Sequence, residues 1–211
     1  MLDKYFLNNI SRLFRDKNYN EVILKIEQNI KINDRPPDLT NICAVSKLLK
    51  ANRSKDDVIS ALNDFEVYYQ KSHKNFQKIE AVNNFIATCI TNVQEFNEII
   101  PYFKKAQKLY EDCEKKIGYD RKLYSHGADL YKYTLNHYKN RKILNELINN
   151  KTDNKNVACT YGYMSNYTYD WGIKEYFDYS KKFEHYFPKH NVKNINEINY
   201  KENKKIRIGF V

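Results

Sequence analysis

Apolar residues recur at helical spacing along most of the chain. One stripe lies on a single helical face near the N-terminus, and a second stripe follows the polar break 16–18. The stripes consist of Phe6, Leu7, Ile10, Leu13 and Phe14, then Tyr19, Val22, Ile23, Ile26 and Ile30. The sequence Asn-Asp-Arg-Pro-Pro at 33–37 ends the second helix, because proline cannot continue one. We therefore predict an antiparallel hairpin of two helices, each of about three turns.

This pair of stripes returns further along the chain. Three more hairpins are predicted, at 42–49 with 58–65, at 82–90 with 96–106, and at 123–135 with 138–148. The second helices of the first three hairpins begin their stripes at Val22, Val58 and Ile99, which are 36 and 41 residues apart. Small residues recur where helices would approach closely, namely Ser46, Ala61, Ala87, Ala106 and Gly127. The near-constant period favours an α-solenoid over the alternative, an irregular helical bundle.

The turn of the first hairpin resembles that of tetratricopeptide repeats. Residues 17–23, Lys-Asn-Tyr-Asn-Glu-Val-Ile, are similar to the family's Gly-Asp-Tyr-Glu-Glu-Ala-Ile, and Pro36 falls close to its closing proline. Glycine is missing from the turn, and valine or isoleucine replaces the packing alanine, so we interpret residues 3–112 as degenerate repeats. The resemblance implies an all-α fold, an α-solenoid of degenerate tetratricopeptide-like hairpins over residues 1–148, with a concave groove for a polypeptide.

In a tetratricopeptide stack the first helix of each pair lines the concave side. Placing this sequence in that register turns eight side chains toward the groove, namely Arg15, Lys47, Lys50, Asn84, Thr88, Asn92, Tyr124 and Lys132. Hydrogen-bond donors predominate among them, which suits the backbone carbonyls and acidic side chains of an extended peptide. The resemblance thus implies a polypeptide partner with acidic or neutral segments. The alternative for each residue is the solvated face of an amphipathic helix.

The end of the chain changes character. Residues 149–156 contain no apolar side chain and predict a loop. The last six residues, Ile-Arg-Ile-Gly-Phe-Val at 206–211, carry the one convincing strand signal of the sequence. A lone strand leaves its backbone groups unpaired, so we interpret this orphan strand as the first strand of a truncated following domain.

Aromatic residues crowd the stretch between that loop and that strand. Interleaved with lysines, they could form a stacking platform for the bases of a nucleic acid. The alternative is a buried core face of a helix. The spacing favours it, because Ile173, Phe177, Phe183 and Phe187 recur at helical intervals. We therefore expect a helix over residues 171–187, within a linker segment that covers residues 149–205.

The C-terminal strand carries a second resemblance. Residues 204–211, Lys-Lys-Ile-Arg-Ile-Gly-Phe-Val, are similar to the entry into the catalytic region of O-GlcNAc-transferase-like (SPINDLY-like) glycosyltransferases. Residues 175–183 look like the helix that precedes this strand in the family, without its histidine. The resemblance implies the acceptor-binding or partner-binding part of an enzyme that transfers N-acetylglucosamine from a UDP-sugar to serine or threonine.

In that family the donor site lies beyond the first strand, so the resemblance assigns no catalytic, cofactor-binding or metal-binding residue to this chain. A UDP-sugar would then be bound only through the missing downstream domain. The competing hypothesis is a stand-alone tetratricopeptide-like scaffold for protein–protein interaction, and a third is an RNA-binding helical repeat.

Composition agrees with a helical chain that is soluble in the cytoplasm. The 211 residues are 42% hydrophobic and 29% charged, with only 5 Gly and 4 Pro, too few for the many turns of a sandwich or barrel. The mean hydropathy is −0.80, and no long apolar run or signal-peptide pattern is present, so no membrane contact is expected. The widely spaced cysteines Cys43, Cys89, Cys113 and Cys159 predict free thiols.

The net charge of +10 raises the question of nucleic-acid binding. Residues 1–112 hold 17 basic and 15 acidic side chains, whereas residues 113–211 hold 19 and 11. Most of the excess is lysine, in a chain also rich in Asn, Ile, Tyr and Phe, which are residues encoded by A/T-rich codons. Genome composition is thus a competing cause of the charge, and we expect no nucleic-acid partner.

Overall fold

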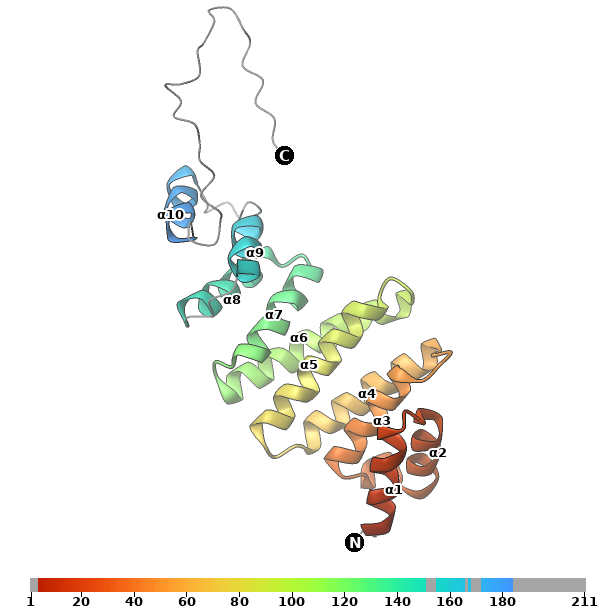
Figure 1. The fold of residues 1–211 in the computed structure, drawn as a ribbon. Coiled ribbons are helices and arrows are strands. Elements are labelled where there is room, and N and C mark those ends of the chain that lie inside the picture. The colour runs from red at the N-terminus through yellow and green to blue at the C-terminus, as the bar shows by residue number, and fades with distance from the viewer. Residues whose placement is uncertain (1–3, 151–154, 166, 168–171, 184–211) are drawn as a thin grey trace, which may run out of the picture. The chain divides into compact units, whose positions relative to one another are not determined.

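The computed structural model describes residues 4–150, 155–165, 167 and 172–183. Within these residues all regular secondary structure is helical, with ten α-helices and two short 3₁₀-helices (Figure 1). The all-α prediction is therefore confirmed for the described part of the chain. The strand predicted at 206–211 lies outside the described residues. The chain divides into two units, Met1–Asp170 with α1–α9 and Trp171–Val211 with α10.

The first unit contains the four predicted helix pairs. Neighbouring helices pack within each pair, and Figure 1 shows the pairs following one another from α1 to α8. The helices are α1 (Lys4–Arg15) and α2 (Tyr19–Asn29), α3 (Pro37–Leu49) and α4 (Lys55–Lys71), α5 (Asn75–Asn92) and α6 (Ile100–Ile117), α7 (Arg121–Tyr133) and α8 (His137–Asn149). The 3₁₀-helices η1 (Ile32–Asp34) and η2 (Asn97–Ile99) precede α3 and α6. Among the described residues, no helix has the length and apolarity to cross a membrane.

Three of the four hairpin turns share one backbone feature. Lys17, Asn52 and Leu135 each have a positive φ, at 59°, 54° and 56°, in the turns α1–α2, α3–α4 and α7–α8. Glycine adopts this left-handed conformation most readily, so each of these three non-glycine residues carries backbone strain. Side-chain caps then start the next helices, with Ser54 and Asp57 forming a capping box at α4 and Asn136 accepting from the Lys139 amide at α8.

Consecutive hairpins contact each other through residues 39 to 43 positions apart. The Gln77 amide donates to Asp38 Oδ1 at 3.0 Å, and Asn84 Nδ2 donates to Asn41 Oδ1 at 3.3 Å, so both bonds join α5 to α3. On the second helices, Lys105 of α6 pairs with Glu66 of α4. The first helices also continue the series, because α5 packs against α7.

Two helices depart from the sequence-based expectations. An unpredicted helix, α9 (Lys155–Ser165), packs against α8 in the segment that we expected to be a linker. In the second unit, α10 (Ile173–Phe183) falls within the helix predicted at 171–187, and the remaining residues of that prediction lie outside the described ranges. The predicted core face of α10 is correct at Phe183, which is buried, and wrong at Phe177, which is exposed beside Lys181.

The small residues predicted at close helix contacts are mostly buried, and a close contact is seen at Gly127. Ala61 and Ala106 are fully buried on the second helices α4 and α6. Gly127 of α7 faces the ring of Tyr110 on α6, and a methyl group at this position would overlap that ring. The absence of a Cβ at Gly127 therefore allows Tyr110 to lie directly under α7.

A buried ion cluster joins the first two hairpins. The Lys47 ammonium lies 2.6 Å from Asp64 Oδ2 and 2.8 Å from Glu27 Oε1, and Arg35 Nη1 lies 3.5 Å from Asp64 Oδ1. Asp64 is 1% exposed and Lys47 is 4% exposed. Burial raises the pKa of Asp64, and the two cations oppose that rise, so the carboxylate depends on them to remain ionised. Cys43 adds no charge, because burial raises the pKa of its thiol to about 12.

The left-handed turn leads to a first stability prediction. Leu135 is 74% exposed, so replacing it with glycine removes backbone strain at little cost in burial. The strain is worth roughly 1–2 kcal/mol and the added freedom of the unfolded chain about 0.5–1 kcal/mol. We expect Leu135→Gly to raise the free energy of unfolding by about 0.5–1 kcal/mol in urea titrations. The control Tyr138→Gly, at an exposed helical position of α8, should lower it by about 1 kcal/mol. Equal losses in both variants would contradict the left-handed turn.

The buried ion cluster leads to a second prediction. Asp64→Asn leaves Lys47 and Arg35 without their shared carboxylate, and removing one partner of a buried pair costs about 3–5 kcal/mol. Glu66→Gln serves as control, because it removes a partly exposed pair from the same helix and should cost about 1 kcal/mol or less. Thermal and urea unfolding would measure both. Similar losses in the two variants would show that the Asp64 cluster has no special role in joining the hairpins.

Candidate functional site

The eight residues predicted to line a groove do not form one surface. Lys47 belongs to the buried ion cluster, and Thr88 and Asn92 are buried in α5. Thr88 Oγ1 donates to the carbonyl of Asn84 at 2.7 Å, and Asn92 Nδ2 donates to the carbonyl of Thr88 at 2.7 Å. These three side chains are engaged inside the helix array, so they offer no free donor to a partner.

The other five are accessible to different degrees. Lys50 pairs with Asp57 at 2.7 Å, and Arg15 and Lys132 are exposed on α1 and α7. Asn84 and Tyr124 each line a cavity, but the two cavities are different ones. The structure therefore distributes the predicted residues over several surfaces and directs attention to these two cavities.

The first cavity, called the α5–α7 cavity here, lies between the first helices of the third and fourth hairpins. Its volume is about 600 Å³, within the range of ligand-binding sites. Helix α5 contributes Phe76, Ile79 and Glu80 together with the amides Asn83 and Asn84. The start of α7 contributes its N-cap Asp120, the cations Arg121 and Lys122, and His126.

Asn83 is the unusual member of this cavity. The residue is 7% exposed, and its buried Oδ1 has no hydrogen-bond partner. An unsatisfied buried polar group costs about 1–3 kcal/mol, so a donor that reached this shielded oxygen through a rotation of the Asn83 side chain would recover that free energy. Nearby polar groups are already engaged: Glu80 accepts from the Tyr68 hydroxyl at 2.7 Å, and the Asp120 carboxylate accepts from the Lys122 and Leu123 amides.

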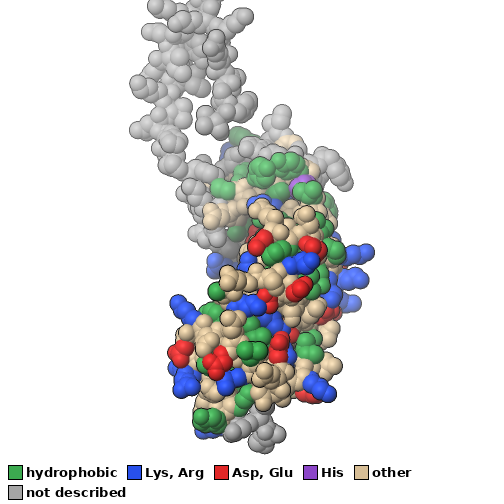
Figure 2. All heavy atoms as spheres, turned by 90° about the vertical axis from the view of Figure 1, so that its right-hand side faces the viewer, with side chains coloured by type: hydrophobic (Ala, Val, Ile, Leu, Met, Phe, Trp, Pro, Cys, Tyr) green, Lys and Arg blue, Asp and Glu red, His purple; other side chains and the backbone are tan. Residues whose placement is uncertain are grey.

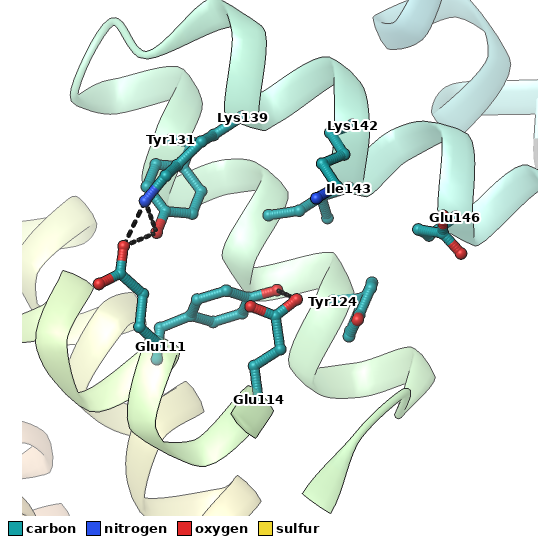
Figure 3. A pocket seen from close by; sticks show the side chains of 9 residues that line it. Glu111, Glu114, Tyr124, Tyr131, Lys139, Lys142, Ile143 and Glu146 are labelled. Atoms are coloured by element: carbon teal, nitrogen blue, oxygen red, sulfur yellow. Dashed lines mark hydrogen bonds and ion pairs between the residues drawn. The ribbon is translucent and has the colours of Figure 1, made fainter. Parts of the chain in front are cut away.

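The second cavity, called the α6–α8 pocket here, lies between α6, α7 and α8 and has a volume of about 380 Å³ (Figure 3). Tyrosines line it from α6 and α7, namely Tyr110, Tyr124 and Tyr131. Carboxylates come from α6 and α8, namely Glu111, Glu114 and Glu146, and α8 adds Lys139, Lys142 and Ile143. Figure 3 shows Glu111 and Glu114 rising from α6 toward α8.

Hydrogen bonds arrange the tyrosines and carboxylates of this pocket in pairs. The Tyr131 hydroxyl donates to Glu111 at 2.9 Å, and Lys139 also contacts Glu111. The Tyr110 hydroxyl donates to Glu114 at 3.5 Å. Burial, together with nearby carboxylates, raises the pKa values of all three tyrosines above their usual range, so these hydroxyls are neutral donors at physiological pH.

Sequence analysis missed this pocket, although a signal for it exists. Lys139, Lys142, Ile143 and Glu146 follow the helical spacing i, i+3, i+4, i+7 on α8, and Tyr124 and Tyr131 are seven residues apart on α7. Such spacing places each set on one helix face. The register between the helices, which brings the faces together, is not contained in that spacing.

Other chemistry finds little support in the described residues. No group of three or more His, Cys, Asp or Glu side chains there could hold a metal ion. All four cysteines are free, as predicted, and burial raises the pKa of Cys89 to about 12 and of Cys113 to about 11, which leaves these thiols protonated. On the face drawn in Figure 2, basic and acidic side chains are interspersed and form no continuous basic stripe.

Comparisons of the chain with known protein families, with curated proteins and with solved structures find no match.

Proposed function

We propose that this chain is a helical-repeat module that binds an extended polypeptide segment in the α5–α7 cavity. The observation that supports this most is the unpartnered Oδ1 of Asn83 in a cavity between the first helices of consecutive hairpins. A backbone N–H of a bound peptide is the donor that would satisfy this oxygen. Because every extended peptide presents such groups, an amide-lined cavity suits a polypeptide better than an apolar ligand.

The stacking of hairpins supports an α-solenoid of degenerate repeats as part of this proposal. Hydrogen bonds and ion pairs recur between residues 39 to 43 positions apart, for example Asp38 with Gln77, Asn41 with Asn84 and Lys55 with Glu98. Equivalent positions of successive hairpins therefore meet, which is the nearest-neighbour pattern of repeat proteins. In such an array the first helices form one continuous surface along which a peptide can extend.

The lining of the cavity is balanced in formal charge, with Glu80 and Asp120 beside Arg121 and Lys122, and its exposed edge is basic. Arg121 and Lys122 are exposed at its edge, whereas Asp120 is engaged in capping α7 and Glu80 holds Tyr68. Two cations thus face the solvent beside amides that bind a peptide backbone. A peptide with a carboxylate next to its bound segment would gain charge-assisted hydrogen bonds, and salt would weaken them.

The glycosyltransferase hypothesis is a separate proposal that rests on the resemblance of residues 204–211. In that hypothesis the polypeptide bound by the repeats is an acceptor, and a UDP-sugar binds to a following domain. Transfer of radiolabelled N-acetylglucosamine by a protein containing these repeats and the sequence that follows them would test it. Peptide binding without transfer would favour the stand-alone scaffold.

Charge removal at the cavity mouth tests the peptide site. The double variant Arg121→Gln, Lys122→Gln should bind acidic peptides about tenfold more weakly, since exposed charge contacts are worth up to about 1 kcal/mol each. A fluorescence-polarisation screen of extended acidic, neutral and basic peptides would measure this. The matched control is Lys104→Gln, Lys108→Gln, which removes the same charge from exposed positions of α6. Equal weakening in both double variants would show that net charge alone causes the effect, and would contradict a peptide site at this cavity.

Asn83→Leu separates binding from folding. Removing the unsatisfied oxygen while keeping the side-chain volume should leave the free energy of unfolding unchanged or raise it by about 1 kcal/mol. Peptide affinity should nevertheless fall about fivefold to tenfold, because a backbone hydrogen bond is lost. Urea unfolding and peptide titration of the same preparation measure both quantities. A stable variant with undiminished affinity for every peptide would exclude Asn83 from recognition.

A further inference from the structure

The α6–α8 pocket has a chemistry that differs from that of the peptide site. Its tyrosine rings meet edge to face, with centroids 6.5 Å apart for Tyr110 and Tyr124 and 5.8 Å apart for Tyr110 and Tyr131. The electron-rich faces of such rings attract cations, most strongly where water is excluded. Tyr110 and Tyr131 are almost completely buried, so Tyr124, which is partly exposed, is the ring of this wall that a ligand can contact.

The carboxylates of the pocket are only partly neutralised. Lys139 pairs with Glu111 and also reaches the Tyr131 hydroxyl, so the Glu111 carboxylate already has a cationic partner. Glu114 accepts a hydrogen bond from neutral Tyr110, and no ion pair in the described part of the chain joins Glu114 or Glu146 to a cation. Two carboxylates therefore border the aromatic wall, and the cation Lys142 lines the same pocket.

We propose that the α6–α8 pocket binds an alkylammonium group, with the partly exposed ring of Tyr124 providing the aromatic contact and Glu114 and Glu146 the negative charge. Figure 3 shows Tyr124 and Glu114 close together at one side of the opening, below α8. An ammonium here gains both a cation–π contact and a charge-assisted hydrogen bond. The ammonium can belong to a lysine side chain of a polypeptide or to a free amine, since both carry the same group.

Lys142 acts as an internal competitor in this arrangement. Its ammonium belongs to the same chemical class as the bound group, and it extends from α8 beside Ile143 (Figure 3). A bound cation must displace it or tolerate its repulsion. Removing the Lys142 charge should therefore strengthen binding, an effect that a nonspecific acidic surface elsewhere on the chain would not produce.

Titrations with defined amines test the proposal. The probes are Nα-acetyl-lysine amide and n-butylammonium, and their neutral counterparts are Nα,Nε-diacetyl-lysine amide and n-butanol. Ring-labelled tyrosine NMR follows binding at the pocket. We expect saturable shifts of the Tyr124 ring with both ammonium probes and none with the neutral ones. Binding of the lysine amide alone would identify a polypeptide source, whereas equal binding of both probes would identify a free amine as sufficient. Equal binding of charged and neutral probes would overturn the proposal.

Four variants assign the effect to named residues. Glu114→Gln and Tyr124→Leu should each weaken ammonium binding about tenfold, and Lys142→Gln should strengthen it about threefold. Asp16→Asn removes one exposed negative charge from the first hairpin and should change nothing. If Glu114→Gln does not fold, Glu146→Gln offers the same charge removal without a tyrosine hydrogen bond to lose. Unchanged affinity in the folded glutamate variants would overturn the proposal, while acidic-peptide binding at the α5–α7 cavity would remain a separate question.

Discussion

Each hairpin of this chain is too short to bury its own apolar faces, so the array depends on burial against the next hairpin. Tyrosine meets this need in a particular way. Tyr68 and Tyr69 of α4 are buried between hairpins, yet their hydroxyls reach Glu80 of α5 at 2.7 Å and Asp112 of α6 at 2.6 Å. Tyr131 of α7 reaches back to α6 in the same manner. An apolar ring fills the interface, and its hydroxyl fixes the register by a directional bond.

Buried charge fixes the register where tyrosine does not. Asp64 holds Lys47 of α3 and Arg35 of the preceding segment, and Lys47 also reaches Glu27 of α2. Lys47 and Asp64 belong to the same hairpin, so sliding the first hairpin along the second would break the Lys47–Glu27 pair, whose glutamate is 43% exposed, and would disturb the buried contact of Arg35 with Asp64. Apolar contacts alone tolerate such a slip, because they have no direction. The buried part of the cluster thus anchors the segment between the hairpins to the second hairpin, and Glu27 adds a partly exposed contact from α2.

The helix pairs could be predicted from the sequence because amphipathic periodicity is a local property. Which face of a helix is buried was predicted less well, and α3 shows the reason. Its leucine at 49 belonged to the predicted stripe but is 53% exposed, whereas Lys47 is buried. Hydrophobicity cannot reveal that Asp64, on another helix, requires a buried cation. Helix α9 was not predicted for a related reason. Its apolar residues Val157, Tyr161 and Met164 lie in a segment rich in aromatic residues, where the sequence shows no clear polar face.

The two cavities depend on relations between helices that no single helix encodes. Asn84 and Tyr124 were candidates for one groove, yet they line different cavities: Asn84 lies with residues of α5 and the start of α7, and Tyr124 lies with residues of α6 and α8. The shape of the α6–α8 pocket further requires Tyr110 to lie under Gly127, a contact between residues 17 positions apart on different helices. Composition identifies the tyrosines and glutamates. Only packing brings them to one wall.

Helix α7 contributes side chains to both cavities. It supplies Arg121 and Lys122 to the α5–α7 cavity and Tyr124 and Tyr131 to the α6–α8 pocket, where glutamates provide the charge. A net charge of +10 describes neither site, because the α5–α7 cavity is lined by two basic and two acidic side chains and the α6–α8 pocket by two basic and three acidic ones. Charges on a surface act mainly within a Debye length of about 8–10 Å, so the local set of residues decides what binds. Binding partners of this chain should therefore be sought by the chemistry of each cavity, and the basic composition of the whole sequence gives no guide to them.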